Sequence, residues 1–179
     1  MGCLVGRKAP DFEIKVLLPD QTFGEIGLED IRREEKWLVL FFYPMDFTIV
    51  CPTEITALSN RYEEFAERHT EIIGISTDSI YTHYAWTMMD RMKNGVGKLN
   101  FALGSDMTHQ ISKAYGVLRE EDGIALRGLF IINPEGEVQY QTVFHHNIGR
   151  DVDEILRVLQ ALQCGGLCPA NWRPGQATL

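Results

Sequence analysis

Cys51 lies where a buried strand is expected to give way to a helix. Residues 37–43 (WLVLFFY) before it form a continuous apolar run of strand length, and residues 54–68 after it show helical spacing with alternating charge. If Thr48 is the N-cap, the cysteine is the third helical residue; if the cysteine is itself the cap, Pro52 takes the first helical position, where proline is favoured. Either arrangement places the sulfur in the first turn.

The first turn of a helix favours an ionised thiol. Unpaired backbone N–H groups and the positive end of the helix dipole stabilise a negative charge there, and the thiolate is the nucleophilic form of cysteine. The alternative is that Cys51 is a small buried apolar residue, which is the commonest fate of a free cysteine. A cysteine considered alone is more often such a buried residue than a nucleophile. The choice between the two interpretations therefore depends on the residues around Cys51.

Those residues form a long pattern. Pro44 lies seven positions before the sulfur, Thr48 lies three positions before it, and Pro-Thr-Glu follows directly. The run resembles the active-site signature P-x-x-x-T-x-x-C of the peroxiredoxins, in the form F-Y-P-x-D-F-T-x-V-C-P-T-E that is typical of their two-cysteine group. Four further segments resemble the family in the same order: 7–12 (RKAPDF), 76–86 (STDSIYTHYAW), 126–134 (LRGLFIINP) and 167–175 (LCPANWRPG).

The resemblance implies a thiol-dependent peroxidase in which Cys51 attacks hydrogen peroxide or an organic hydroperoxide. Breaking the O–O bond spreads negative charge over sulfur and both oxygens, so the site needs donors. Thr48 would orient the peroxide, and Pro44 would shield the sulfur from water. Arg127 matches the family's arginine by its Leu-Arg-Gly-Leu-Phe context and would stabilise the departing oxygen, although its spacing alone suggests a solvated arginine. Glu54 would hold the guanidinium, and an exposed helix-start carboxylate explains this residue nearly as well.

The C-terminal cysteines are expected to complete the cycle. In the resembling family the sulfenic acid condenses with a C-terminal cysteine of a second subunit, which matches Cys168 in Leu-Cys-Pro-Ala-Asn-Trp. Cys164 is either an inert helix-end residue, which we favour, or a second thiol that competes with Cys168 for the sulfenic acid. Cys3 is expected to have no role in the reaction. The resemblance therefore implies a homodimer, assembled as a ring of dimers, that is recycled by a dithiol reductant protein without a cofactor.

Two features differ from the peroxide-sensitive branch of that family. Residues 94–98 (NGVGK) stand where that branch carries Gly-Gly-Leu-Gly, and the chain ends at Leu179, with no room for an extra C-terminal helix after Cys168. We expect the segment around Cys51 to unwind readily, so that the disulfide forms before further oxidation.

Composition excludes several classes of protein. With 179 residues, 45% of them hydrophobic, the chain is long enough to bury a full core. Its net charge of −8 argues against binding to nucleic acid. Apolar runs are too short for a membrane span, the first residues lack the apolar stretch of a signal peptide, and Gly6 stands where a myristoylation motif wants Ser or Thr. We therefore expect a cytoplasmic protein without membrane partners.

Metal binding is not expected either. Four cysteines are too few and too unevenly spaced for a disulfide framework. Cys164 and Cys168 could supply half of a zinc site, but no second pair matches them, and the adjacent His145 and His146 would point to opposite faces of a strand.

The remaining elements are expected to build an α/β fold around this chemistry. We expect strands at 71–77, 100–103, 126–132 and 137–144, a turn at 133–136, and helices at 81–93, 109–115 and 151–162. This order fits a central mixed sheet flanked by helices, and the resemblance implies the thioredoxin-like fold. The chain is interpreted as one domain, 1–179, with residues 163–179 as the tail that carries the resolving cysteine.

Two alternative functions remain. The chain could be an oligomeric holdase chaperone, alone or together with peroxidase activity. A thioredoxin-like disulfide exchanger is disfavoured, because the turn Cys51-Pro52-Thr53-Glu54 has no second cysteine two residues on.

Overall fold

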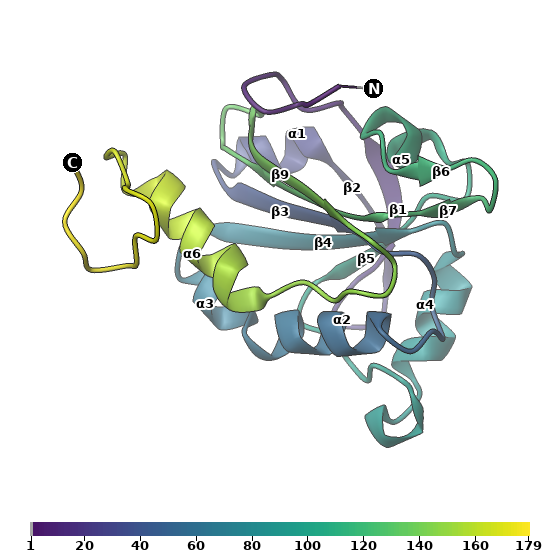
Figure 1. Cartoon of the computed structure of the whole chain (residues 1–179). Coiled ribbons are helices and arrows are strands. Elements are labelled where there is room, and N and C mark those ends of the chain that lie inside the picture. Colours follow the sequence, from purple (N-terminus) through teal and green to yellow (C-terminus); the bar gives the residue numbers. More distant parts are fainter. Residues whose placement is uncertain (1) are drawn as a thin grey trace. The chain divides into compact units, whose positions relative to one another are not determined.

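Residues 2–179 are described by a computed structural model (Figure 1). One compact unit ends at Gly149, and Arg150–Leu179 form a second unit, which we describe by itself. The elements are, in chain order, β1 (Glu13–Leu17), β2 (Phe23–Gly27), α1 (Leu28–Arg33), β3 (Trp37–Phe42), α2 (Cys51–Asn60), α3 (Tyr62–Ala66), β4 (Thr70–Ser76), α4 (Ile80–Thr87), the 3-10 helix η1 (Arg91–Lys93), β5 (Ala102–Ser105), α5 (Gln110–Ala114), β6 (Leu118–Arg119), β7 (Ile124–Ala125), β8 (Arg127–Ile132), β9 (Val138–Phe144) and α6 (Val152–Gln163).

A seven-stranded mixed sheet organises the first unit, in the order β2-β1-β5-β4-β3-β8-β9. The pairs β3–β4 and β4–β5 are parallel, and the other neighbouring strands are antiparallel. Strand β3 is apolar throughout because helices cover both of its faces. Phe41 pairs with Gly74 across β3 and β4, and a Cβ at Gly74 would lie 2.5 Å from the Phe41 ring, so the core requires glycine there.

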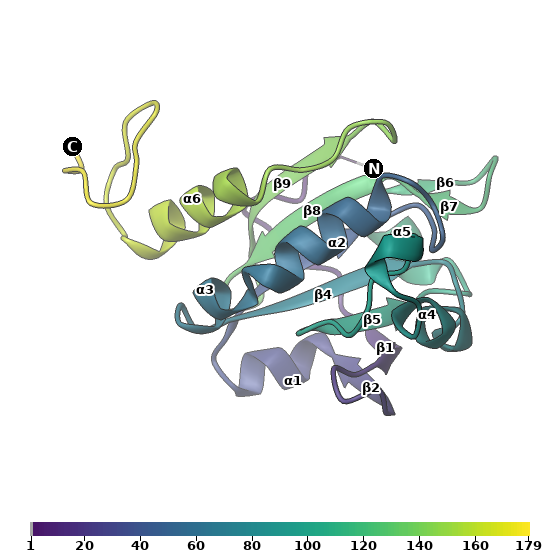
Figure 2. The ribbon, with the colours of Figure 1, turned by 90° about the horizontal axis from the view of Figure 1, so that it is seen from below.

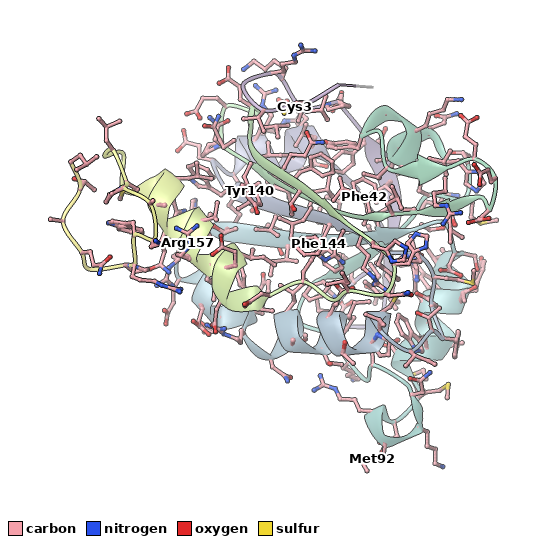
Figure 3. All side chains as sticks on the ribbon, in the orientation of Figure 1. Cys3, Phe42, Met92, Tyr140, Phe144 and Arg157 are labelled. Carbon is pink, nitrogen blue, oxygen red and sulfur yellow. The ribbon has the colours of Figure 1, made fainter. Side chains whose placement is uncertain are left out.

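The helices of the first unit lie in two layers. Helices α1 and α5 lie on one face of the sheet, and α2, α3 and α4 lie on the other, as the two views together show (Figures 1 and 2). On the α1 side, Phe42 packs in a continuous cluster of buried apolar side chains with Leu28, Ile31 and Tyr115. Figure 3 shows Phe42 in the interior and Met92 projecting outward from η1. The expected central mixed sheet flanked by helices is confirmed.

The parallel strands determine where the Cys51 turn lies. The carboxyl ends of β3 and β4 meet at one edge of the sheet, so the segments that follow them are neighbours. The Asp46 amide after β3 donates to Asp78 Oδ2 after β4 at 2.9 Å. This hydrogen bond fixes the turn that leads from β3 into α2.

Two expected helices were wrong in their extent. The helix expected over 81–93 ends at Thr87, because the Asp90 carboxylate accepts from the Met92 amide at 2.7 Å and begins the separate helix η1. The helical stretch at 54–68 is interrupted at Arg61, which separates α2 from α3. The expected strands and the helix at 109–115 are present with bounds shifted by one or two residues.

The second unit consists of α6 and an irregular segment after it. Asp151 caps α6, because its side chain accepts from the amides of Asp153 and Glu154 at 2.8 and 3.3 Å. The buried Trp172 holds the segment, as its indole N–H donates to the Gln176 carbonyl at 3.1 Å. Among residues 2–179, no helix is long and apolar enough to cross a membrane.

Candidate active site

Cys51 is the first residue of α2, and Val50 occupies the N-cap position. Both expected caps were therefore wrong. The Thr48 hydroxyl donates to the Met45 carbonyl at 2.9 Å within the turn, and Pro52 takes the second helical position. The sulfur nevertheless lies in the first turn, where the helix dipole favours an anion. Cys51 is fully buried.

A buried ion pair lies beside the sulfur. Arg127 on β8 donates from Nη1 to Cys51 Sγ at 3.3 Å, and the same nitrogen pairs with Glu54 Oε2. Glu54 and Arg127 are only 3% and 2% exposed. Glu54 lies one helical turn after Cys51, so α2 presents a sulfur and a carboxylate to one guanidinium. Of the two explanations for Glu54, the buried pair applies, and the exposed helix-start carboxylate does not.

Backbone geometry completes the support of Arg127. Its Nε donates to the His146 carbonyl at 2.8 Å, and Arg127 pairs with Phe144 in the register of β8 and β9. Figure 3 labels Phe144 on β9. Arg127 is therefore held by Glu54 on α2 and by the His146 carbonyl after β9, which limits the positions that its guanidinium can adopt. The His146 contact could not be expected from the sequence, because a backbone carbonyl carries no sequence signal.

Pro44 and Thr48 lie on the turn between β3 and α2. Pro44 is buried and Thr48 is partly exposed. Since the Thr48 hydroxyl uses its proton on Met45, its oxygen remains an acceptor for an incoming O–H group. The Asn94 side chain donates to the Thr48 carbonyl at 3.1 Å, so the 94–98 loop is tied to this turn.

A buried polar network that sequence reasoning missed lies under the same turn. His83 Nδ1 contacts Asp46 Oδ2 at 2.6 Å, and the Tyr43 hydroxyl donates to Asp46 Oδ1 at 2.8 Å. Burial opposes charge on His83, but the hydrogen bond and the charge of Asp46 outweigh it and raise the pKa of His83. Burial raises the pKa of Asp46 as well, against the opposing effect of His83. The sequence signals were the Asp in Pro-Met-Asp-Phe-Thr and the His in residues 76–86 (STDSIYTHYAW), and neither indicates that the two side chains meet.

The other cysteines are more accessible. Cys3 and Cys164 are exposed, and Cys168 is partly exposed. Within the second unit, the sulfur atoms of Cys164 and Cys168 lie 3.4 Å apart. Trp86, in contrast, is fully buried in the first unit.

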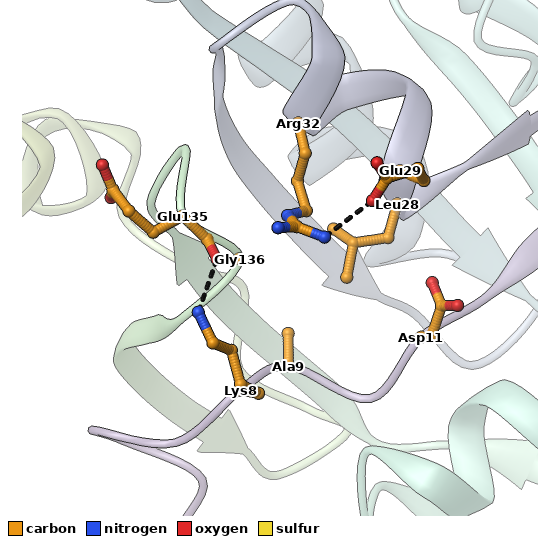
Figure 4. Close-up of a pocket in the computed structure, with 8 residues that line it drawn as sticks. All are labelled: Lys8, Ala9, Asp11, Leu28, Glu29, Arg32, Glu135 and Gly136. Atoms are coloured by element: carbon orange, nitrogen blue, oxygen red, sulfur yellow. Dashed lines mark hydrogen bonds and ion pairs between the residues drawn. The ribbon is translucent and has the colours of Figure 1, made fainter.

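Neither a metal centre nor the surface pocket beside α1 competes with Cys51. Over residues 2–179, His, Cys, Asp and Glu side chains form no group of three that could hold a metal ion. A pocket between α1 and the β8–β9 turn is lined by polar groups that already have partners (Figure 4): Lys8 donates to the Glu135 carbonyl at 2.8 Å, and Arg32 pairs with Glu29 at 2.6 Å. No cysteine lines this pocket.

Known proteins resemble the chain along its length. A profile of the AhpC/TSA family matches residues 5–141. The chain is 64% identical to YkuU of Bacillus subtilis, which is provisionally named a peroxiredoxin, over 98% of each chain. It is 52% identical to the chloroplastic 2-Cys peroxiredoxin BAS1 of Spinacia oleracea, over 98% of this chain and 67% of that one. The reduced 2-Cys peroxiredoxin of Plasmodium vivax superposes with a TM-score of 0.95 at 42% identity, covering 99% of this chain and 93% of that one.

These similarities agree with a buried cysteine at a helix start that receives a hydrogen bond from a buried arginine. The family profile covers most of the chain, and the relatives cover nearly all of it. The chain therefore belongs to the AhpC/TSA family and is a two-cysteine peroxiredoxin with a thioredoxin-like fold.

Proposed function

We propose that Cys51 is the residue that reacts with peroxide in this thiol-dependent peroxidase, and that Cys168 of a second subunit resolves the product. The observation that carries the proposal is the 3.3 Å hydrogen bond from Nη1 of the buried Arg127 to Sγ of the fully buried Cys51. A cationic donor at the sulfur favours the thiolate and also faces the charge that develops when an O–O bond breaks.

The first step is an in-line displacement at oxygen. The Cys51 thiolate forms an S–O bond while the O–O bond breaks, and the departing hydroxide or alkoxide takes up a proton to leave as water or an alcohol. The sulfur is oxidised to sulfenic acid and the peroxide is reduced by two electrons. Arg127 stabilises the departing oxygen, Thr48 accepts a hydrogen bond from the peroxide, and Pro44 excludes water. Glu54 holds Arg127 in position.

The second step requires Cys51 to leave its site, because a fully buried sulfur is out of reach of another thiol. The Cys168 thiol attacks the sulfenic sulfur, an S–S bond forms, and water leaves. A dithiol reductant protein then restores both thiols by exchange. This step implies a homodimer at least, and we include the ring of dimers in the proposal on the family resemblance.

Cellular location and domain organisation belong to the same proposal. The bacterial relatives favour a cytoplasmic enzyme, whereas BAS1 of Spinacia oleracea is chloroplastic. We retain one functional domain, 1–179, with 163–179 as the tail that carries Cys168. The names of the relatives favour peroxidase over holdase activity.

The test uses the Cys164→Ser protein, in which Cys51 and Cys168 are the cysteines available for resolution besides the exposed Cys3. One equivalent of hydrogen peroxide should convert monomers into disulfide-linked dimers on a non-reducing gel. Mass mapping should find Cys51 joined to Cys168 of the other chain. Dimers joined through Cys3, or a disulfide confined to one chain, would contradict the assignment.

A further inference from the structure

Cys164 and Cys168 lie close enough to form a disulfide after a small movement. Their sulfurs are 3.4 Å apart, whereas a disulfide bond is about 2.05 Å long. Both sulfurs also lie near the Ala161 carbonyl, at 3.1 Å from Cys164 and 3.8 Å from Cys168. The two sulfurs therefore share one backbone acceptor at the end of α6.

A glycine turn produces this contact. Cys164 caps the C-terminus of α6, and Gly165 follows with a φ of +69°, a left-handed conformation that reverses the chain at low energetic cost for glycine. A Cβ at Gly166 would lie 2.7 Å from the Thr178 side chain, so a larger residue would disturb the segment that folds back there. The reversal brings Cys168 next to the helix end, instead of leaving it further along an extended tail.

The ionisation of Cys168 depends on its neighbour Cys164. Partial removal from water raises the pKa of Cys168, and the hydrogen bond and charge of Cys164 raise it further, against the opposing effect of Arg157. A negative charge on one sulfur therefore disfavours a charge on the other.

We propose that Cys164 is a third redox-active cysteine that moves the disulfide from Cys51 to the tail. The step rests on the proposed Cys51–Cys168 disulfide. The Cys164 thiolate attacks the sulfur of Cys168, the Cys164–Cys168 bond forms, and the Cys51–Cys168 bond breaks with release of the Cys51 thiolate. No net oxidation occurs in this exchange, because one disulfide and one thiolate give one disulfide and one thiolate.

Proximity and the leaving group both favour this direction. Attack within one tail, between sulfurs already in contact, has a far higher effective concentration than attack by a separate molecule. Exchange is faster when the leaving sulfur is a stable thiolate. Cys51 regains the Arg127 hydrogen bond when it returns to α2, which favours its release. The resulting disulfide is accessible to the dithiol reductant, since Cys164 is exposed and Cys168 is partly exposed.

The inference is tested by locating free thiols after one equivalent of hydrogen peroxide, without reductant. Acid quenching over time, alkylation and mass mapping of the wild-type chain should show an interchain Cys51–Cys168 link that gives way to an intrachain Cys164–Cys168 link. Cys51 should become alkylatable again as this exchange proceeds. In Cys164→Ser the interchain disulfide should persist. Cys3→Ser is the matched control at an exposed cysteine, and in it the two disulfides should appear in the same order as in the wild type.

The other possible results distinguish failure of the disulfide transfer from failure of the proposed function. We call the proposed transfer of the disulfide from Cys51 to Cys164 the relay. A wild-type Cys51–Cys168 link that persists while Cys164 stays alkylatable would overturn the relay and leave the proposed function intact. A Cys164–Cys168 link that forms equally in Cys51→Ser would mean direct oxidation of the tail, which also overturns the relay. If neither wild type nor Cys164→Ser forms the Cys51–Cys168 link, the proposed function itself fails.

The number of peroxide equivalents consumed provides a second readout. Wild-type protein without reductant should consume a second equivalent per chain, because the relay frees Cys51 to react again. Cys164→Ser should stop after one equivalent, since its Cys51 stays in the disulfide. Equal consumption by both proteins would contradict the relay.

Discussion

The two cysteine regions differ in how their sulfurs are supported. Cys51 is fully buried and receives a hydrogen bond from a buried guanidinium, whereas Cys164 and Cys168 lie at the end of α6 near solvent and contact backbone carbonyls. A sulfur that reacts with peroxide needs positive charge and exclusion of water. Sulfurs that exchange disulfides need access to other thiols, and the second region provides that access.

The ion pair at Cys51 also makes that region the less tolerant of change. Glu54 and Arg127 are both buried, and removing one partner of a buried pair leaves an uncompensated charge, which costs about 3–5 kcal/mol. At the end of α6, Cys164 and Cys168 carry no such pair, and an exposed Cys→Ser change there should alter stability by less than about 0.5 kcal/mol.

Replacing Cys51 should have the largest effect on activity. Cys51→Ser should abolish peroxide consumption, because a serine hydroxyl without an adjacent base is a very weak nucleophile. Peroxide consumption in stopped flow with excess reductant is the measurement. Cys3→Ser is the matched control, and it should consume peroxide at the wild-type rate. Turnover that survives in Cys51→Ser would remove this residue from the mechanism.

The next largest effect is expected at Arg127. Arg127→Ala removes a donor from the breaking O–O bond and should slow the peroxide step by about 10²–10³-fold, as loss of an oxyanion donor does. Single-turnover stopped flow measures this rate, and circular dichroism checks that the variant is folded. Arg127→Gln retains an N–H donor without the charge and should be intermediate. Arg32→Ala, which removes an exposed guanidinium in α1, is the control.

Glu54 should matter less, because it acts through Arg127. Glu54→Gln retains an acceptor for the guanidinium but loses the charge, and should slow the peroxide step less than Arg127→Ala does. The two substitutions should also be non-additive in the double variant, since they disturb one contact. Equal small effects of both substitutions would mean that Arg127 does not act on the reacting atoms.

The His83 network predicts a smaller effect, on stability. The pKa of His83 is raised above its ordinary value of 6.5, so the stabilisation is fully present below about pH 6.5 and is lost as pH rises through the raised pKa. The raised pKa of Asp46 has the same sign, and its stabilisation is fully present below about pH 3.8 and lost as pH rises through the raised pKa.

Urea unfolding at about pH 6 and about pH 9 tests this expectation. The wild-type free energy of unfolding should be lower at about pH 9 than at about pH 6. His83→Gln should show a smaller decrease, because it lacks the titrating group. An equal fall in both proteins would assign the pH dependence to other groups.

Much of the central sheet could be predicted from the sequence, because β3, β4 and β8 are apolar runs of strand length. Strands β1 and β2 were missed, since they lie toward one edge of the sheet and have exposed positions that interrupt the apolar pattern. The first-turn position of Cys51 was predicted, but its cap was not, because the hydrogen bond of Thr48 to Met45 depends on the local turn.

Contacts between distant segments were the least predictable. Asp46 and His83 meet because parallel pairing of β3 and β4 brings the ends of both strands together, and nothing in either segment alone indicates this. The contact between Cys164 and Cys168 similarly depends on the left-handed Gly165. The catalytic roles expected for the site residues remain predictions: Cys51, Arg127, Glu54, Pro44, Thr48 and Cys168.

The most direct test of the account is to trap the first oxidised sulfur. In the double variant Cys164→Ser/Cys168→Ser, which lacks both tail thiols, the sulfenic acid should persist, so a carbon nucleophile specific for sulfenic acids, added after one equivalent of hydrogen peroxide, should label Cys51 in nearly every chain. Mass mapping locates the label. Labelling of Cys3 while Cys51 remains a free thiol would contradict the central claim that Cys51 reacts with peroxide.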